Sequence, residues 1–199
     1  MTDRNGDDPR ALQFAALLTA AKSGANWGST TLWVEYSPAV TAFLRARGSR
    51  EPEDLSSEVF LAVFDRLPEF VGNETQFRSF VFSVAYRRLV DEFRRRARRG
   101  ESEEWIAERD PDSSPSAEDD ATDRIADRTT LSLLNDLPAD QRDVMVLRII
   151  ADLTVDQIAT VIGKRSGAVK ALQRRALERL RKNISPTRTP EQPSSDGVE

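Results

Sequence analysis

The 199-residue sequence contains neither cysteine nor histidine. Without cysteine the chain cannot form disulfides or use a thiolate nucleophile, and without histidine it lacks the side chain that most often acts as a general acid or base. Zinc sites built from the usual nitrogen and sulfur ligands are excluded for the same reason. The nine glycines are scattered, and neither GxGxxG nor GxxxxGKS or GxxxxGKT occurs. We therefore expect no metal, no cofactor and no enzymatic activity.

Long hydrophobic runs are also missing. No apolar stretch approaches the roughly 18 residues that a membrane-spanning helix needs. The N-terminal sequence MTDRNGDDPR has neither the basic start nor the apolar segment of a signal peptide. Apolar residues make up 39% of the chain and charged residues 31%, which suits small cores beneath a charged surface. We predict a soluble, cytoplasmic protein that makes no membrane contact itself.

Charge is segregated along the chain, which the formal net charge of −4 conceals. Residues 87–99 carry seven arginines against two acids, residues 101–127 carry eleven acids against two arginines, and residues 164–182 carry eight bases against one acid. The acidic block is rich in serine and proline and has little apolar periodicity, so it cannot bury enough surface to offset the entropy of ordering. We predict a flexible acidic linker between two basic-edged domains.

Helical spacing of apolar residues recurs throughout, whereas period-two runs bounded by turn residues are scarce. We therefore predict an all-α protein made of two small helical domains joined by the flexible acidic linker. The predicted segments are a disordered N-terminus at 1–10, a helical bundle at 11–99, the linker at 100–128, a helix-turn-helix domain at 129–183 and a disordered tail at 184–199.

The N-terminal domain is predicted to contain four helices. Two lie at residues 10–22 and 30–47, a third begins in EPEDLSSEVFLAVFDRL and ends before Pro68, and the fourth runs from about 75 to 98. One face of the third helix surrounds an exposed leucine with polar residues at helical spacing. On the residues alone, this face could simply be solvated. It comprises Asp54, Ser57, Glu58, Leu61 and Asp65.

The fourth helix is apolar on two sides. One stripe consists of Phe77, Phe80, Val81 and Val84, and the other of Phe82, Tyr86, Leu89 and Phe93. Burial of both stripes forces the basic residues outward together, and so dense a basic surface favours phosphate binding over a merely solvated face. The candidate DNA-binding residues of this surface are Arg87, Arg88, Asp91, Arg94, Arg95 and Arg98.

The C-terminal domain has the pattern of a helix-turn-helix. Thr154 and Gln157 fit a capping box, and Gly163 ends a short helix. Ala159 and Val169 fall at the small and core positions of the motif. The alternative is a helical hairpin with a basic surface that binds no DNA. The candidate DNA-binding residues, whether they contact bases or phosphates, are Arg165, Ser166, Gly167, Lys170, Ala171, Arg174 and Arg175.

Three segments together resemble bacterial RNA polymerase sigma factors of the extracytoplasmic-function (ECF) type, in the sigma-70 family. They are DLSSEVFLAVFDRLPEF, FRSFVFSVAYRRLVDEFRRRARR and LPADQRDVMVLRIIADLTVDQIATVIGKRSGAVKALQRRALERLRK. The resemblance implies that the polar face of the third helix binds core RNA polymerase. It also implies that the protein directs the enzyme to promoters and helps to melt the DNA, and that an anti-sigma factor restrains it.

The resemblance further implies two DNA-binding surfaces. The fourth helix and the loop before it would hold the minus-ten element, with Asn73, Phe77 and Arg78 receiving an unstacked base. The helix-turn-helix would bind the minus-thirty-five element. Leu172 stands where the family often has a basic residue, and Gln173 where an apolar one is common. Two rival hypotheses are a stand-alone helix-turn-helix regulator and a protein-binding adaptor that never touches DNA.

Overall fold

The computed structural model describes residues 9–100 and 133–184, and all regular structure within those ranges is helical. The N-terminal module contains α1 (Pro9–Lys22), α2 (Asn26–Ala46), α3 (Pro52–Arg66), a short 3-10 turn η1 (Leu67–Glu69) and α4 (Glu74–Arg98). The C-terminal module contains α6 (Ala139–Ile149), α7 (Val155–Ile162) and α8 (Ser166–Ile184). The predicted all-α fold is confirmed. Residues 1–8, most of the predicted linker and most of the predicted tail lie outside the described residues.

The core of the N-terminal module forms where α2 packs against α1, α3 and α4. Leu32, Val40 and Phe43 of α2 are fully buried. The Phe43 ring meets the Phe82 ring of α4 edge to face, with ring centroids 5.7 Å apart. Both predicted apolar stripes of α4 therefore contribute to the packing, because Phe77 is fully buried as well. The basic side of α4 is the side left facing solvent.

The helix predicted to begin at residue 30 instead begins at Asn26, so that Gly28 lies inside α2. Gly28 looked like part of a connection because glycine disfavours helix interiors. In the folded chain it marks the close crossing of α1 and α2. A Cβ atom at position 28 would lie 2.5 Å from the backbone nitrogen of Ala21, so only glycine fits there without displacing backbone.

The C-terminal module forms a helix-turn-helix on a third helix, α6. Val144 and Leu147 of α6, Ile158 of α7 and Val169 of α8 are almost completely buried. Gly163 ends α7 with φ at 67°, a left-handed conformation that favours glycine and turns the chain toward α8. The predicted turn is confirmed.

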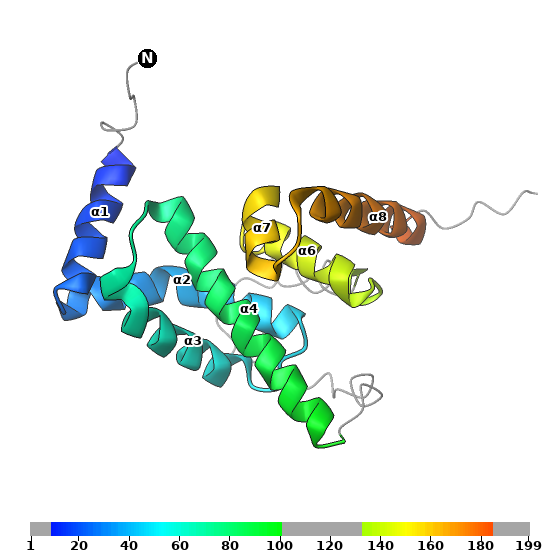
Figure 1. Ribbon diagram of the computed structural model, residues 1–199, viewed down its shortest axis with the longest axis horizontal. Helices are drawn as coiled ribbons and strands as arrows, with labels where there is room; N and C mark the ends of the chain where they lie inside the picture. The colour runs from blue at the N-terminus through cyan, green and yellow to red at the C-terminus, as the bar shows by residue number, and fades with distance from the viewer. Residues whose placement is uncertain (1–8, 101–132, 185–199) are drawn as a thin grey trace, which may run out of the picture.

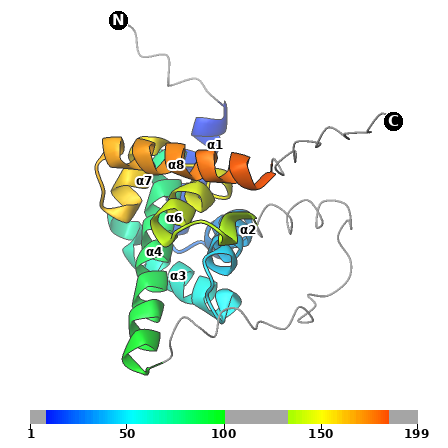
Figure 2. The same ribbon diagram turned by 90° about the vertical axis from the view of Figure 1, so that its right-hand side faces the viewer.

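The two modules pack against each other through α4 with α7 and through α2 with α6. α7 lies beside the first half of α4, and α8 lies on the side of α6 and α7 that faces away from α4 (Figures 1 and 2). The C-terminal end of α4 extends beyond this contact (Figure 1). Among the described residues, no helix is both long enough and apolar enough to cross a membrane.

The crossing of α1 and α2 gives a stability prediction with a matched control. Gly28→Ala should lower the free energy of unfolding by about 1–3 kcal/mol, because the added methyl group meets backbone that cannot move away. Gly167→Ala, where no atom lies within 4 Å of the added Cβ, should be neutral or stabilising. Urea unfolding followed by circular dichroism measures both changes. Equal stability of the two variants would contradict the proposed close crossing.

Candidate nucleic-acid interface

The polar face predicted on the third helix is presented on the outer side of α3. Leu55, Val59 and Val63 fill the opposite side and are buried in the core. Leu61 is 67% exposed, which is high for a leucine within a well-packed helix. A lone apolar side chain ringed by polar and acidic groups suits contact with another protein. The exposed residues are Asp54, Ser57, Glu58, Leu61 and Asp65.

The second half of α4 carries what we term the arginine ridge. It consists of Arg87, Arg88, Asp91, Arg94, Arg95 and Arg98. Every member is exposed except Arg88, which is half-buried and has its Nη1 atom 3.9 Å from Oε2 of Glu58 on α3. Arg94 lies 3.7 Å from Asp91, an exposed pair that leaves most of the basic charge uncompensated. The ridge is thus a surface of concentrated positive charge on a rigid helix.

Two side chains on α4 fix the ridge to the rest of the module. Glu92 accepts hydrogen bonds from Ser49 Oγ at 2.8 Å and from the Arg50 backbone nitrogen at 3.1 Å. Arg96 donates to the Gly48 carbonyl at 3.1 Å, and its guanidinium lies over the Phe93 ring. Arg96 therefore holds the helix against the α2–α3 connection, whereas its neighbours face solvent.

The start of α4 differs from the sequence-based expectation. Asn73 is the N-cap residue, and its side chain accepts a hydrogen bond from the Gln76 backbone nitrogen at 3.0 Å. Phe77 is fully buried, with its ring centroid 5.2–5.6 Å from those of Phe14, Tyr36 and Phe70. Phe77, which was expected to receive a base, is therefore a core residue in this structure, and it could reach a base only if the bundle unpacked.

Arg78, the third candidate in this segment, lies among acidic side chains. Its guanidinium is 3.5 Å from Glu74 and 3.7 Å from Asp152, which belongs to the other module. Partial burial raises the pKa of nearby Glu35, and the charge of Glu74 raises it further. Arg78 is one-third exposed and so remains able to exchange these carboxylates for another anion.

The helix-turn-helix is held by local contacts that the sequence indicates. Thr154 caps α7 through a reciprocal pair of hydrogen bonds with Gln157, as predicted. Ser166 donates to Asp156 at 2.5 Å, and Lys164 pairs with Asp140 at 3.1 Å. The turn before α8 is therefore tied to both preceding helices.

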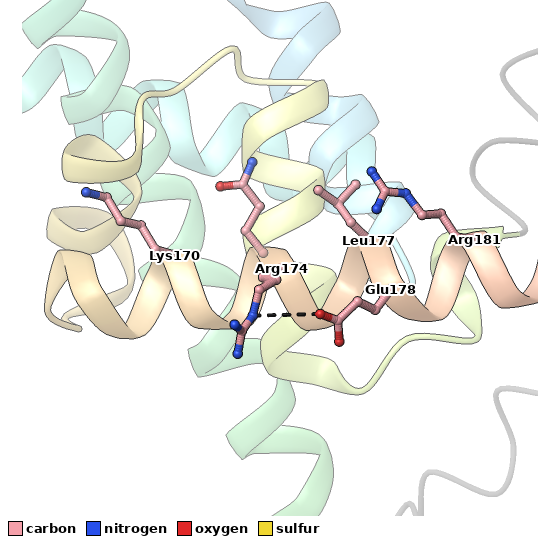
Figure 3. A pocket seen from close by; sticks show the side chains of 6 residues that line it. Lys170, Arg174, Leu177, Glu178 and Arg181 are labelled. Carbon is pink, nitrogen blue, oxygen red and sulfur yellow. Dashed lines mark ion pairs between the residues drawn. The ribbon is translucent and has the colours of Figure 1, made fainter.

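The outer side of α8 forms a shallow basic hollow of about 450 Å³. Figure 3 shows Lys170, Arg174 and Arg181 along this side, with Arg174 3.7 Å from Glu178. Gln173 lines the hollow, whereas Leu172 packs against the core. Of the predicted DNA-binding set, Arg165, Gly167, Lys170, Arg174 and Arg175 are exposed, and Ser166 and Ala171 are half-buried.

A buried charged cluster joins the two modules. Arg47, at the end of α2, forms an ion pair with Asp143 of α6, and the Tyr86 hydroxyl of α4 donates to Asp143 at 3.1 Å. Desolvation raises the pKa of Asp143 despite the opposing effects of Arg47 and Tyr86. Burial likewise raises the pKa of Tyr86, with Asp143 adding to the shift. Sequence reasoning missed this cluster because Arg47 and Asp143 are 96 positions apart.

Known proteins resemble the chain over both modules. Residues 32–99 match the family model "Sigma-70 region 2", and residues 133–182 match "Sigma-70, region 4". The ECF RNA polymerase sigma factor ShbA of Streptomyces griseus is 31% identical over 87% of this chain and 96% of its own. The chain belongs to the ECF sigma factors. SigD of Mycobacterium tuberculosis, from the same family, is 32% identical over 74% of this chain and 72% of its own.

Two solved structures share the fold. CnrH, in complex with the cytosolic domain of CnrY, superimposes with a TM-score of 0.61 at 19% identity, over 86% of this chain and 96% of its own. RpoE of Bartonella quintana, in complex with the anti-sigma factor NepR, gives 0.61 at 20% identity, over 80% and 98%. The sequence-based prediction of the family is confirmed. The protein is a sigma factor, a subunit that directs RNA polymerase to promoters.

The capping role of Asn73 gives a prediction about stability. Asn73→Ala should lower the free energy of unfolding by about 1 kcal/mol, because the Gln76 backbone nitrogen is left without its partner. Asn73→Asp, which can cap the helix equally well, should keep native stability. Chemical denaturation measures both. If the alanine variant were as stable as the native protein, the cap would contribute nothing.

Proposed function

We propose that this sigma factor uses three surfaces in sequence. The outer side of α3 binds core RNA polymerase, the arginine ridge with the start of α4 holds the minus-ten element, and α8 binds the minus-thirty-five duplex. The protein catalyses no reaction itself. The observation that carries the proposal is the basic, solvent-facing side of two helices, α4 and α8, in a chain with a net charge of −4. Positive charge gathered in this way attracts phosphate.

The ridge suits a single strand held by its backbone during melting. Arginine forms paired hydrogen bonds with phosphate, and its charge persists at any physiological pH. Extrusion of a base costs a few kcal/mol, which contacts in a pocket must offset. With Phe77 buried, the side chain best placed to meet DNA at the start of α4 is Arg78, and Asn73 retains its capping role.

The outer side of α8 suits duplex DNA, since a helix-turn-helix places its second helix in the major groove. Lys170 and Arg174 are exposed on the first half of α8 and can donate to guanine edges or to phosphates. Contacts of Lys164 and Ser166 with the preceding helices orient this half before any DNA binds. A preoriented helix loses less entropy on binding.

The three proposed surfaces imply which molecules the protein binds. We place the protein in the cytoplasm, with core RNA polymerase and promoter DNA, and we assign its domains to residues 11–99 and 129–183. The matches to regions 2 and 4 support that division. An anti-sigma factor is proposed as a further partner, because the similar folds of CnrH and RpoE were solved with CnrY and the anti-sigma factor NepR. The exposed Leu61 gives such a partner an apolar contact.

Transcription in vitro tests the function directly. Purified bacterial core polymerase should start at new sites on fragmented genomic DNA only when this protein is added, and those sites should share two upstream elements at a fixed spacing. Sequencing of the RNA 5′ ends gives the sites. The absence of new starts with a matched and active core enzyme would favour the stand-alone regulator or the adaptor.

The two basic surfaces should fail in different ways. Lys170→Gln with Arg174→Gln should reduce initiation at least tenfold at promoters that depend on the minus-thirty-five element, because a good base contact is worth about 1–3 kcal/mol. Quantitative transcription is the measurement.

Arg94→Gln with Arg98→Gln should weaken the dependence of promoter binding on salt. The slope of the logarithm of the binding constant against the logarithm of the salt concentration should become shallower by up to about 1.4, because each single-strand phosphate that is no longer neutralised contributes about 0.7. Salt titration is the measurement.

The matched control is Arg45→Gln with Arg179→Gln. It removes the same charge from two exposed positions outside both surfaces. It should leave initiation and the salt slope near native values. Equal decreases in the control and in the test variants would mean that overall charge, rather than these two surfaces, governs binding.

A further inference from the structure

Several polar side chains cross the contact between the modules. At its centre, the Arg47 and Asp143 side chains are 7% and 8% exposed, and the Tyr86 hydroxyl completes the cluster from α4. At its edge, Gln157 Nε2 donates to the Thr75 carbonyl at 3.0 Å, and Asp152 lies 3.7 Å from Arg78. The contact therefore draws on α2, α4, α6 and α7 and on the turn before α7.

This contact reaches part of one DNA-binding surface, the start of α4, and leaves both the arginine ridge and the polymerase-binding surface open. Thr75 and Arg78 belong to the start of α4, the segment proposed to receive the minus-ten base. A groove of about 410 Å³ between α4 and α7 includes Gln76, Ser79 and Phe80 on one wall and Asp156, Gln157 and Thr160 on the other. The residues on the outer side of α3, by contrast, are exposed.

A buried ion pair is well suited to hold such an arrangement reversibly. Removing both charges from water costs free energy that their attraction only partly repays, so the pair adds little net stability. The pair nevertheless favours one arrangement of the two modules, because any shift of one module that separates the two groups leaves a charge buried without its partner. Once the modules have separated completely, water solvates both groups and the penalty disappears.

We propose that Arg47, Asp143 and Tyr86 form a latch that keeps the free sigma factor closed, with the C-terminal module covering the start of α4 until the modules separate on core polymerase. This rests on the proposed role of that segment in minus-ten binding. Because α3 stays exposed, core polymerase can dock while the latch is closed. The apparent affinity of the free protein for minus-ten DNA is then the affinity of the open form multiplied by the fraction of molecules that are open.

The test uses the full-length protein and two single substitutions, one in each module. Asp143→Asn leaves Arg47 buried without its counterion, and Arg47→Met does the same to Asp143. Removing one partner of a buried pair is strongly unfavourable in the state that buries it, so each variant should raise the open fraction about tenfold or more. Glu53→Gln, which breaks the exposed Arg45–Glu53 pair within the N-terminal module, is the control.

Two readouts are needed. Small-angle X-ray scattering of the free protein should give a larger radius of gyration for both latch variants than for the native protein and the control. Fluorescence anisotropy with a labelled single strand should show about tenfold tighter binding by the latch variants. That strand carries the non-template minus-ten sequence of a promoter found by transcription. Circular dichroism verifies that helix content is native, and if Asp143→Asn fails to fold, Arg47→Met alone decides.

The outcomes separate this inference from the proposed function. Native scattering and native affinity in a folded latch variant would overturn the latch. An enlarged radius without tighter binding of the strand would overturn the covering of the minus-ten surface. Failure of the native protein to direct core polymerase to any promoter would instead remove the proposed function, and scattering would still decide whether the cluster holds the modules together.

Discussion

The burial of aromatic rings on two sides of α4 determines which side of that helix meets solvent. Phe77 packs against rings from α1 and α2, and Phe82 packs against Phe43. Burial of one such side chain contributes about 1.5–3 kcal/mol. Repulsion between exposed like charges one turn apart costs only about 0.2–0.5 kcal/mol. The aromatic contacts therefore outweigh the repulsion, and the arginine ridge persists as a consequence of the packing.

The same helix also fixes where the second module lies. Tyr86 extends the apolar side of α4 as far as the contact with α6, where its hydroxyl meets Asp143. Further along, Glu92 and Arg96 bind the connection between α2 and α3, so the ridge is held rigidly beyond that contact. One helix thus carries core packing, the contact between modules and the proposed DNA surface on different sides of its cylinder.

Local signals in the sequence are sufficient to predict the helix-turn-helix. The Thr154–Gln157 capping box and Gly163 set the two ends of α7 through contacts between residues close in sequence. Their pattern therefore predicts this helix directly. The depth at which Phe77 is buried has no such local signal, because periodicity shows that a side chain belongs to an apolar stripe but not whether a loop or a core covers it. The early start of α2 depends on how α1 crosses Gly28. The pairing of Arg47 with Asp143 links distant positions and has no local signature.

If Arg78 binds promoter DNA as proposed, the closed state and the promoter compete for its guanidinium. Asp152 presents a carboxylate to this guanidinium, and a backbone phosphate offers the same single negative charge and paired acceptor oxygens. That pair is partly exposed and worth at most about 1 kcal/mol, so a promoter phosphate can replace it. Nucleic acid has no such access to the buried Arg47–Asp143 pair. Under the proposed latch, promoter DNA alone is therefore expected to release the edge of the contact but not its centre. Because α3 remains exposed, polymerase docking can supply the remaining free energy and make promoter binding conditional on the enzyme.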